Sequence, residues 1–257
     1  MGTAPAASAP KNVAAAKPDL PFYNASPVAI STGKWLVVVA ACALSYVQLV
    51  AVPLPGSAAF QNWAHAILFP VIPLIALAWA APAGWTAIFR RVRPRDVGAM
   101  FGFAAINLVA TLGIAAVLGR FIELETNPIG DTLAALTAGE RVSAYAASIP
   151  QLIGEELVTI LPLLAIVSIL VRSFRWSRGA AVTVAWLVTA TTFAAMHLPT
   201  YGWNVIQCFA VIGVARLILS LAYLKTKNLW VSAGAHIIND WVLFTLPLVT
   251  AGLVFLV

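Results

Sequence analysis

The chain has 257 residues, of which 61% are hydrophobic and only 9% are charged, and its mean hydropathy is +0.94. Soluble domains carry about 25% charged residues, so this composition excludes a soluble globular protein and predicts an all-α, polytopic transmembrane helical bundle. The formal charge of +6 indicates no nucleic-acid partner, because the 15 basic residues gather in alternate loops, as they do in membrane proteins.

The first 30 residues differ in composition from the rest of the chain. Residues 1–30 are rich in Ala, Pro and Ser and contain no apolar stretch of the kind found in signal peptides. We expect them to form a disordered cytoplasmic tail. Residues 31–257 are expected to form a single transmembrane helical domain, whose main partner is the lipid bilayer.

Apolar runs recur through the second region. They predict about seven spans, at Trp35–Val52, His65–Ala81, Gly98–Leu118, 150–171, Ala180–Leu198, Trp203–Leu224 and from Trp230 towards the C-terminus, where Pro247 could split the helix. Arginines crowd the loops after the second and fourth spans, which places these loops inside, whereas the acidic loop before residue 150 belongs outside. The chain is therefore expected to be a multi-pass protein of a bacterial-type cytoplasmic membrane with its N-terminus inside.

Three of the later spans contain groups that a bilayer disfavours. Glu155 and Glu156 lie in the fourth span, His197 ends the fifth, and His236 and Asp240 lie in the seventh. A charged residue near the centre of a span costs about 2.5–3.5 kcal/mol on insertion scales, so such residues indicate function or an internal partner. A polar seam that locks the helices together is the structural alternative, and a proton relay is a third one.

Two carboxylates and two imidazoles on separate helices are the residue types of a hydrolytic or metal site. His197 and His236 can ligate a divalent metal such as zinc or orient a water, while a buried carboxylate can accept and return that water's proton. His236 and Asp240 are four residues apart and share one helix face, so Asp240 can hold the imidazole ring. The predicted catalytic set is Glu155, Glu156, His197, His236 and Asp240.

Adjacent glutamates on a helix point about 100° apart, so we expect one to act in chemistry and the other to be paired. Arg216 stands alone inside the sixth span and needs an acidic partner. We predict that it pairs with Glu156 and leaves Glu155 free; Asp240 is the rival partner.

The depths of these residues do not agree. At ~1.5 Å per residue from the basic loops, Glu155 and His197 lie ~25–28 Å deep, whereas His236 lies ~14 Å deep. They can meet only if residues 227–234 rise in extended form or if the last span differs from the predicted one.

At these residues the sequence resembles the CPBP family of intramembrane proteases, relatives of the CAAX-processing prenyl-protein endopeptidase and of bacterial abortive-infection proteins. The pattern EExxxR, FxxxH and HxxxN or HxxxD matches at Glu155-Glu156, at Phe193 with His197, and at His236 with Asp240. The resemblance covers about residues 145–250. It departs from the pattern at Ile160, where the family has arginine.

The resemblance implies that Glu155 activates a water and that His197 and His236 are metal ligands or partners of the oxyanion and the base. The implied function is an intramembrane (metallo)endopeptidase that hydrolyses a peptide bond in a membrane-embedded or membrane-delivered protein or peptide. The alternative is a non-catalytic relative that acts as subunit, scaffold or regulator of a membrane-protein complex, a function compatible with isoleucine at position 160.

Overall fold

A computed structural model of the chain describes residues 19–254, with their side chains as far as residue 248. This part is helical and contains no strand. Its elements are α1 (Thr32–Ala51), α2 (Ala58–Ala80), the 3₁₀ turn η1 (Trp85–Ile88), α3 (Pro94–Leu118), α4 (Ile129–Ala135), α5 (Ala138–Arg172), α6 (Arg178–Met196), α7 (Val205–Gln207), the π turn η2 (Cys208–Ile212), α8 (Gly213–Thr226) and α9 (Leu229–Val254).

Hydroxyl side chains begin four of the long helices. Ser31, Ser57 and Ser177 each accept a hydrogen bond from the backbone N–H three residues later. Thr137 does the same for α5, and Glu140 returns the bond to the N–H of Thr137, which completes a capping box. This box starts α5 twelve residues before the predicted span at 150, so residues 138–149 extend the central helix.

Six helices in the described part are long and apolar enough to cross a membrane. They are α1, α2, α3, α5, α6 and the continuous segment Val205–Thr226. The seventh predicted span corresponds to α9, which is not among the six and which carries His236, Asn239 and Asp240. Pro247 lies inside α9 and does not split it. The predicted class, a polytopic helical bundle, is confirmed.

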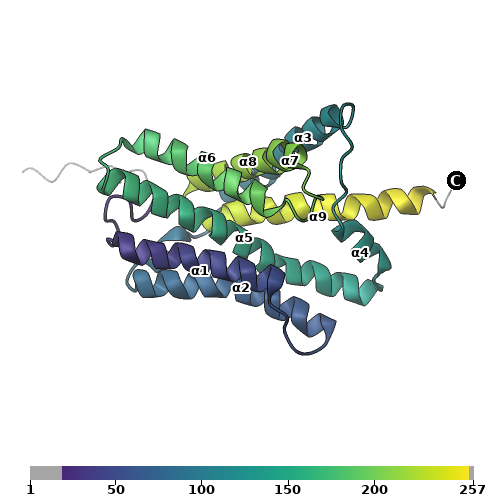
Figure 1. Cartoon of the computed structure of the whole chain (residues 1–257), viewed down its shortest axis with the longest axis horizontal. Helices are drawn as coiled ribbons and strands as arrows, with labels where there is room; N and C mark the ends of the chain where they lie inside the picture. The colour runs from purple at the N-terminus through teal and green to yellow at the C-terminus, as the bar shows by residue number, and fades with distance from the viewer. Residues whose placement is uncertain (1–18, 255–257) are drawn as a thin grey trace, which may run out of the picture.

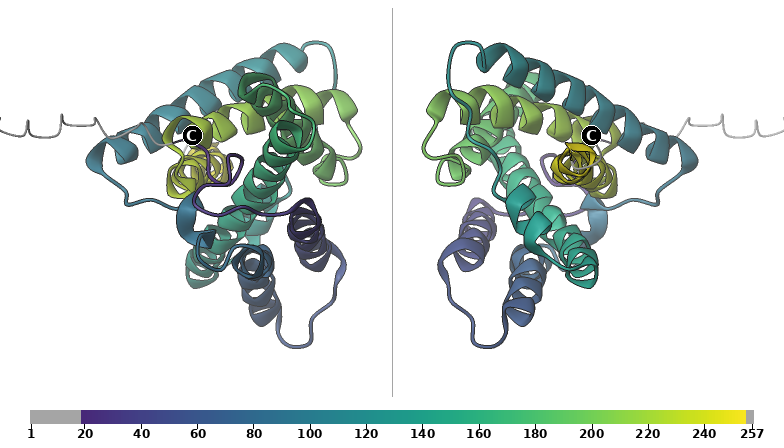
Figure 2. Two further views of the ribbon diagram at one scale, coloured as in Figure 1. Left: turned by 90° about the vertical axis from the view of Figure 1, so that its left-hand side faces the viewer. Right: turned by 90° about the vertical axis from the view of Figure 1, so that its right-hand side faces the viewer.

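Helix α5 forms the centre of the bundle. The hairpin of α1 and α2 packs on one side of α5, and α6 and α9 pack on the other, with α3 against α8 and α9 (Figure 1). The end-on views show α5 between these two groups and α3 lying obliquely across the second one (Figure 2). In the most apolar window of α5, 67% of the residues are buried, compared with 17% in α3. Glu155 and Glu156 therefore lie on the most buried of the six candidate spans.

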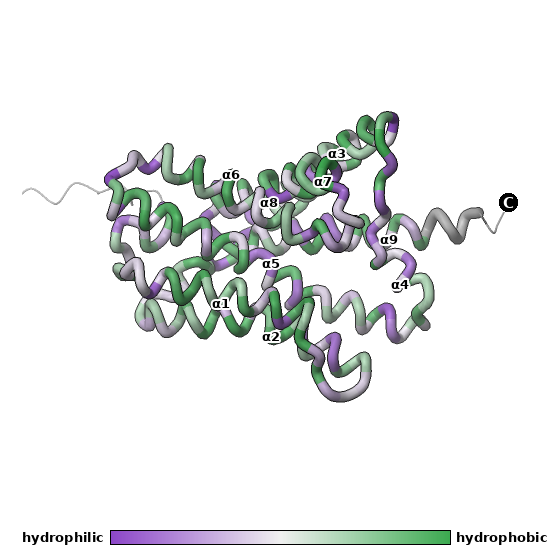
Figure 3. Tube along the Cα trace, viewed as in Figure 1, coloured by the Kyte–Doolittle hydropathy of each residue, from purple (hydrophilic) through white to green (hydrophobic). Residues whose placement is uncertain are grey.

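Polar residues gather mainly at the two ends of the bundle, while hydrophobic residues run along the helices (Figure 3). Nine of the 15 arginines and lysines lie in the loops that follow α2, α5 and α8 or within two residues of them, and the segment between α3 and α5 carries Glu123, Glu125 and Asp131. The apolar side chains on the outside, such as those of α3, are exposed in the way that lipid contact requires.

Gly154 lies where α5 packs against Phe69 of α2. A Cβ at this position would lie 2.4 Å from Cδ1 of Phe69, whose ring is buried and cannot move aside freely. We expect Gly154→Ala to destabilise the protein by about 1–3 kcal/mol through overpacking. Unfolding in detergent by heat measures this change. Gly139→Ala is the matched control on the same helix, because a Cβ there meets nothing within 4 Å; equal stability of the two variants would contradict the prediction.

The second part of the predicted tail, residues 19–30, folds across the end of the bundle; the first part, residues 1–18, lies outside the described residues. Leu20, Phe22 and Ile30 are buried, and the Phe22 ring contacts the Trp35 ring edge-on at 5.8 Å. Burial of these apolar side chains is the physical reason why this part is ordered. The transmembrane domain therefore includes residues from 19 onwards.

Asp19 fastens this segment to the start of α6. Its partial burial would raise the pKa of the carboxyl group, but hydrogen bonds from Arg178 and Tyr23 outweigh burial and lower the pKa to about 2. Because the folded value lies below the ordinary value of about 3.9, Asp19 stabilises the fold above pH ~4, and this contribution is lost as the pH falls through about 2. We expect Asp19→Asn to lower the midpoint of thermal unfolding at pH 7 and to have a much smaller effect at pH 2, where about half of the folded protein carries a protonated Asp19. An effect of the same size at pH 2 and pH 7 would contradict this assignment.

The turn between α8 and α9 resolves the mismatch in depth. Arg216 contacts Glu156, and from there α8 runs ten residues, ~15 Å, to Thr226, whereas α5 runs ~24 Å to Arg172. The α8–α9 turn is therefore recessed, and buried Asn228 exchanges hydrogen bonds with the backbone of Arg90 there. The residues after the turn are helical, not extended, so the prediction failed because it placed all basic loops at one depth.

Candidate active site

A buried ion pair joins α5 to α8. The guanidinium Nη2 of Arg216 donates to Oε1 of Glu156, and both side chains are fully buried. This is the pair that the sequence analysis predicts, with Asp240 excluded as the partner. Ile160, one turn after Glu156 on α5, is also fully buried. An arginine from another helix thus neutralises the glutamate that the family motif pairs within one helix.

Arg216 is held by two further groups. Its Nη1 donates to the hydroxyl of Thr159 at 3.2 Å, and its guanidinium carbon lies 4.5 Å from the centre of the Phe193 ring. A cation over an aromatic face is attracted by the ring quadrupole, most strongly where water is absent. Three helices, α5, α6 and α8, therefore fix one arginine.

Glu156 also orients His236. Nδ1 of His236 lies 3.0 Å from the same Oε1 that accepts from Arg216. A carboxylate can only accept, so Nδ1 carries the proton of this hydrogen bond. The other ring nitrogen, Nε2, then faces Oε2 of Glu155 at 3.8 Å and Oδ2 of Asp240 at 3.5 Å. The predicted set Glu155, Glu156, His236 and Asp240 is thus gathered around one imidazole.

His197 is oriented by its own helix. Its Nδ1 lies 2.9 Å from the carbonyl oxygen of Phe193, one turn earlier on α6, and its ring lies 4.5 Å from the Phe193 ring. A carbonyl oxygen cannot donate, so Nδ1 is protonated and Nε2 of the neutral ring keeps its lone pair. Phe193 therefore holds both Arg216 and His197, which gives its place in the FxxxH motif a physical role.

Glu155 is the exposed member of the glutamate pair. Its side chain keeps 16% of its surface accessible, compared with none for Glu156. Gln151, one turn earlier, donates to Oε1 of Glu155 at 3.5 Å. Glu155 and His197 both line two adjoining cavities, so a water or a bound molecule can reach both side chains.

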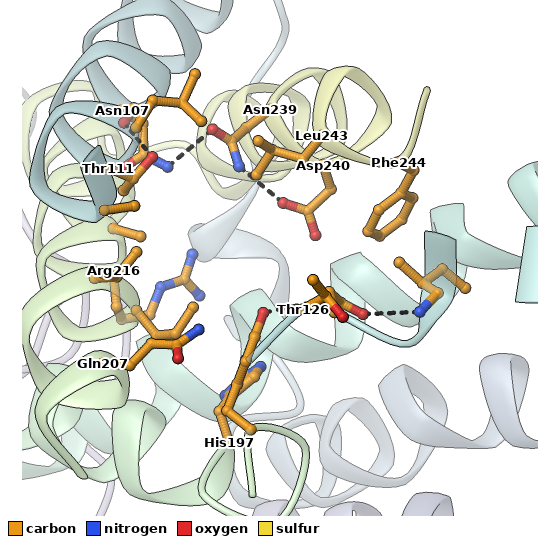
Figure 4. A pocket seen from close by; sticks show the side chains of 18 of the residues that line it. Asn107, Thr111, Thr126, His197, Gln207, Arg216, Asn239, Asp240, Leu243 and Phe244 are labelled. Carbon is orange, nitrogen blue, oxygen red and sulfur yellow. Dashed lines mark hydrogen bonds between the residues drawn. The ribbon is translucent and has the colours of Figure 1, made fainter. Parts of the chain in front are cut away.

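The two cavities meet at the candidate catalytic residues. The first, of about 460 Å³, lies between α3, α8 and α9 (Figure 4). The second, of about 650 Å³, lies between α2, α4 and α5. The residues common to both are Asn127, Ile129, Glu155, His197, Asp240 and Phe244. A bound chain can therefore extend from Glu155 in two directions.

Asn107 belongs to the site although the sequence analysis did not include it. It is fully buried on α3, and its Nδ2 donates to Oδ1 of Asn239 at 3.0 Å, while Nδ2 of Asn239 donates to Oδ1 of Asp240 at 2.9 Å (Figure 4). These bonds form a relay from α3 to the carboxylate that faces His236. An asparagine in the middle of an apolar span is costly unless it is bonded, and that signal could have identified it.

For the peptide hydrolysis that we propose for this site, we expect Asn107→Leu to lower kcat about tenfold and to change KM much less, because Asn239 and Asp240 would lose the donor that fixes them. The measurement is steady-state hydrolysis by the reconstituted protein, beside its thermal unfolding. Thr111→Val is the matched control on α3, since the hydroxyl of Thr111 bonds the carbonyl of Asn107 and stays outside the relay. Equal kinetics in the two variants would show that the relay has no positioning role.

The predicted metal ligands are His197 and His236. Within residues 19–254, no group of three or more His, Cys, Asp or Glu side chains is placed to hold an ion. Nδ1 of His197 bonds the carbonyl oxygen of Phe193, and Nδ1 of His236 bonds Glu156. In each ring, Nε2 is therefore the nitrogen that is left for another partner.

A family model matches part of this chain. Residues 138–242, from the start of α5 to the first half of α9, match the family model described as type II CAAX prenyl endopeptidase Rce1-like. No curated protein and no solved structure matches the chain. The matched region contains both glutamates, both histidines, Arg216 and Asp240, whereas Asn107 lies outside it.

Proposed function

We propose that this chain, whose residues 138–242 form an Rce1-like domain of the CAAX-protease-like family, is an intramembrane endopeptidase. The observation that carries the proposal is the division of labour between two adjacent glutamates. Glu156 is sealed in an ion pair with Arg216, while Glu155 faces two cavities beside two oriented histidines. A polar seam that served only helix packing would not leave a carboxylate open to a cavity.

The chemistry that we propose starts with a water between Glu155 and His197. Glu155 accepts a proton from this water, the oxygen attacks the carbonyl carbon of the substrate, and the peptide C–N bond breaks as the carboxyl group of Glu155 returns the proton to the leaving nitrogen. The lone pair on Nε2 of His197 orients the water. When doubly protonated, His236 can donate from Nε2 to the oxyanion, held in position by Glu156.

Arg216 takes the place of the arginine that the family motif has at position 160, because it is paired with Glu156. Isoleucine at position 160 favours a non-catalytic relative only if Glu156 is left without a counter-charge, and the ion pair to α8 supplies one. The geometry around Glu155 is therefore compatible with hydrolysis, and we propose the enzyme in preference to a scaffold or a subunit of a membrane complex.

The proposal is tested by placing the purified protein in lipid vesicles with a library of peptides that contain apolar and charged stretches. Mass spectrometry identifies the products, and we expect cleavage at internal bonds. A metal analysis of the wild type beside His197→Ala shows whether a divalent ion such as zinc is held. Stoichiometric purification with another membrane protein, without cleavage of any peptide, would favour the non-catalytic function.

A further inference from the structure

The arginine-rich end of the bundle contains a further cavity, away from the candidate active site. It has a volume of about 160 Å³ and lies between the start of α1 and the end of α5 (left side of Figure 1). Its wall residue Arg172 is ~25 Å along α5 from Glu155. We propose that this cavity binds the phosphate group of an anionic phospholipid. Binding there does not depend on peptide hydrolysis.

Buried side chains in the wall of this cavity lack a hydrogen-bond acceptor. Trp35 lines the cavity and is fully buried, and its Nε1–H has no acceptor among the described residues. An indole nitrogen can only donate, so a ligand that satisfies it must offer an acceptor. Ser168, also buried, adds a hydroxyl to the same wall. A buried donor without a partner is costly, which favours a ligand rich in acceptor oxygens.

The start of α1 adds the partial positive charge of a helix N-terminus. Ser31 caps this helix, since its hydroxyl accepts from the backbone N–H of Lys34 and its carbonyl oxygen accepts from that of Trp35. Thr32, the first helical residue, lines the cavity, and its backbone N–H bonds no described residue. Unpaired N–H groups at a helix N-terminus bind anions such as phosphate.

Arg172 supplies a full positive charge. Its Nη1 donates to the carbonyl oxygen of Ile30 at 2.9 Å, and its guanidinium forms no ion pair with a described residue. No Asp or Glu is among the described residues that line the cavity. The carbonyl oxygen of Ile169, at the end of α5, already accepts from the N–H groups of Ser173 and Phe174. The walls therefore fit an anion and not a cation.

The surroundings of the cavity favour a phospholipid over a soluble phosphate. Leu36 and Val37, near the start of α1, are exposed, and so are the aromatic rings of Phe174 and Trp176 just after α5. Exposed apolar side chains of a membrane helix contact acyl chains, and aromatic rings at the ends of spans lie at the level of the headgroups. A phosphate in this cavity therefore lies at headgroup depth, where basic pockets bind anionic lipids, with its acyl chains along α1.

Binding is measured on the full chain, purified in detergent, by native mass spectrometry and by the shift in the midpoint of thermal unfolding. The probes are dioctanoyl phosphatidylglycerol, dioctanoyl phosphatidylcholine and inorganic phosphate. We expect phosphatidylglycerol to bind about tenfold more tightly than phosphatidylcholine, because the walls hold no carboxylate for the choline ammonium. Equal binding of the two lipids would overturn the proposal. Stabilisation by inorganic phosphate equal to that by phosphatidylglycerol would overturn the assignment to a lipid.

Variants locate the site. Arg172→Gln should weaken phosphatidylglycerol binding about tenfold, and Arg172→Lys should weaken it less, because lysine keeps the charge without the planar fork. Arg175→Gln is the matched control, because Arg175 lies in the loop that follows and does not line the cavity. Equal losses in Arg175→Gln and Arg172→Gln would mean that the whole basic end attracts the lipid, which would overturn the assignment to the cavity.

The buried donors are tested by two small changes. Trp35→Phe keeps an aromatic ring but removes the donor, and Ser168→Ala removes one oxygen; each should weaken phosphatidylglycerol binding about threefold. Thermal unfolding without lipid shows whether each variant keeps its fold, and Ser168→Ala is the milder change if Trp35→Phe does not. Wild-type affinity in folded Ser168→Ala and folded Trp35→Phe, or in Ser168→Ala when it alone is folded, would overturn the role of the buried donors.

Discussion

Glu155→Gln should abolish peptide hydrolysis while the protein keeps its fold. General base catalysis by a positioned carboxylate contributes typically 10²–10⁴-fold, and glutamine has the same shape without the ability to accept the proton. Because the Glu155 side chain is partly exposed and forms no ion pair with arginine, its replacement should leave thermal unfolding in detergent nearly unchanged. The measurement is the rate of product formation together with the unfolding midpoint.

Glu156→Gln is the comparison variant for this test, and unlike Glu155→Gln it should lower the stability of the fold. It removes the partner of a buried arginine and the acceptor of His236, so the fold loses stability in addition to any loss of rate. Full activity in Glu155→Gln, or equal destabilisation of the two variants, would refute the division of labour between the glutamates.

Arg216→Ala should lower the free energy of unfolding by about 3–5 kcal/mol, because removing one member of a buried pair leaves the other charge uncompensated. The double variant Arg216→Ala with Glu156→Gln should recover much of this loss, since no unpaired charge then remains. Thermal or denaturant unfolding in detergent measures both. Arg95→Ala is the control, because Arg95 is 75% exposed and its ion pair is worth little. Additive losses in the double variant would contradict the pairing.

Moving the arginine from α8 to α5 extends this prediction. Ile160 lies on the same face of α5 as Glu156, one turn later, so Arg216→Leu with Ile160→Arg would restore the pair within one helix. We expect this variant to be more stable than Arg216→Leu alone and to regain hydrolysis. Failure on both counts would mean that Arg216 has a role beyond neutralising Glu156.

The sequence is sufficient to predict the class of the fold and which ionisable residues of the later spans lie together, for identifiable reasons. Long apolar runs leave a membrane bundle as the one structure compatible with the composition, and the cost of a buried charge identifies Glu156 and Arg216 as partners from different spans. The register of one helix against another is harder to predict from the sequence. The depth of His236 depended on a recessed turn held by Arg90 and Asn228, which are distant in sequence.

Other parts of the site depended on tertiary packing in the same way. The orientation of His197 depends on a backbone carbonyl of its own helix, and Asn107 enters the site only because α3 packs obliquely on α9. Residues 19–30 are likewise folded because Leu20, Phe22 and Ile30 are buried against the end of the bundle. No local pattern encodes such contacts.

The position of Arg216 also bears on how a substrate could enter. An arginine on α5 would pair within that helix and leave its neighbours free to slide, whereas Arg216 ties α8 to α5, and the shared carboxylate ties α9 to both through His236. One carboxylate thus links three helices. On the side of α5 that faces α2 and α4, where the larger cavity lies, no ion pair joins described residues of these helices; the links there are hydrogen bonds, from Trp63 to Ser143 and from Arg141 to carbonyl oxygens of α4.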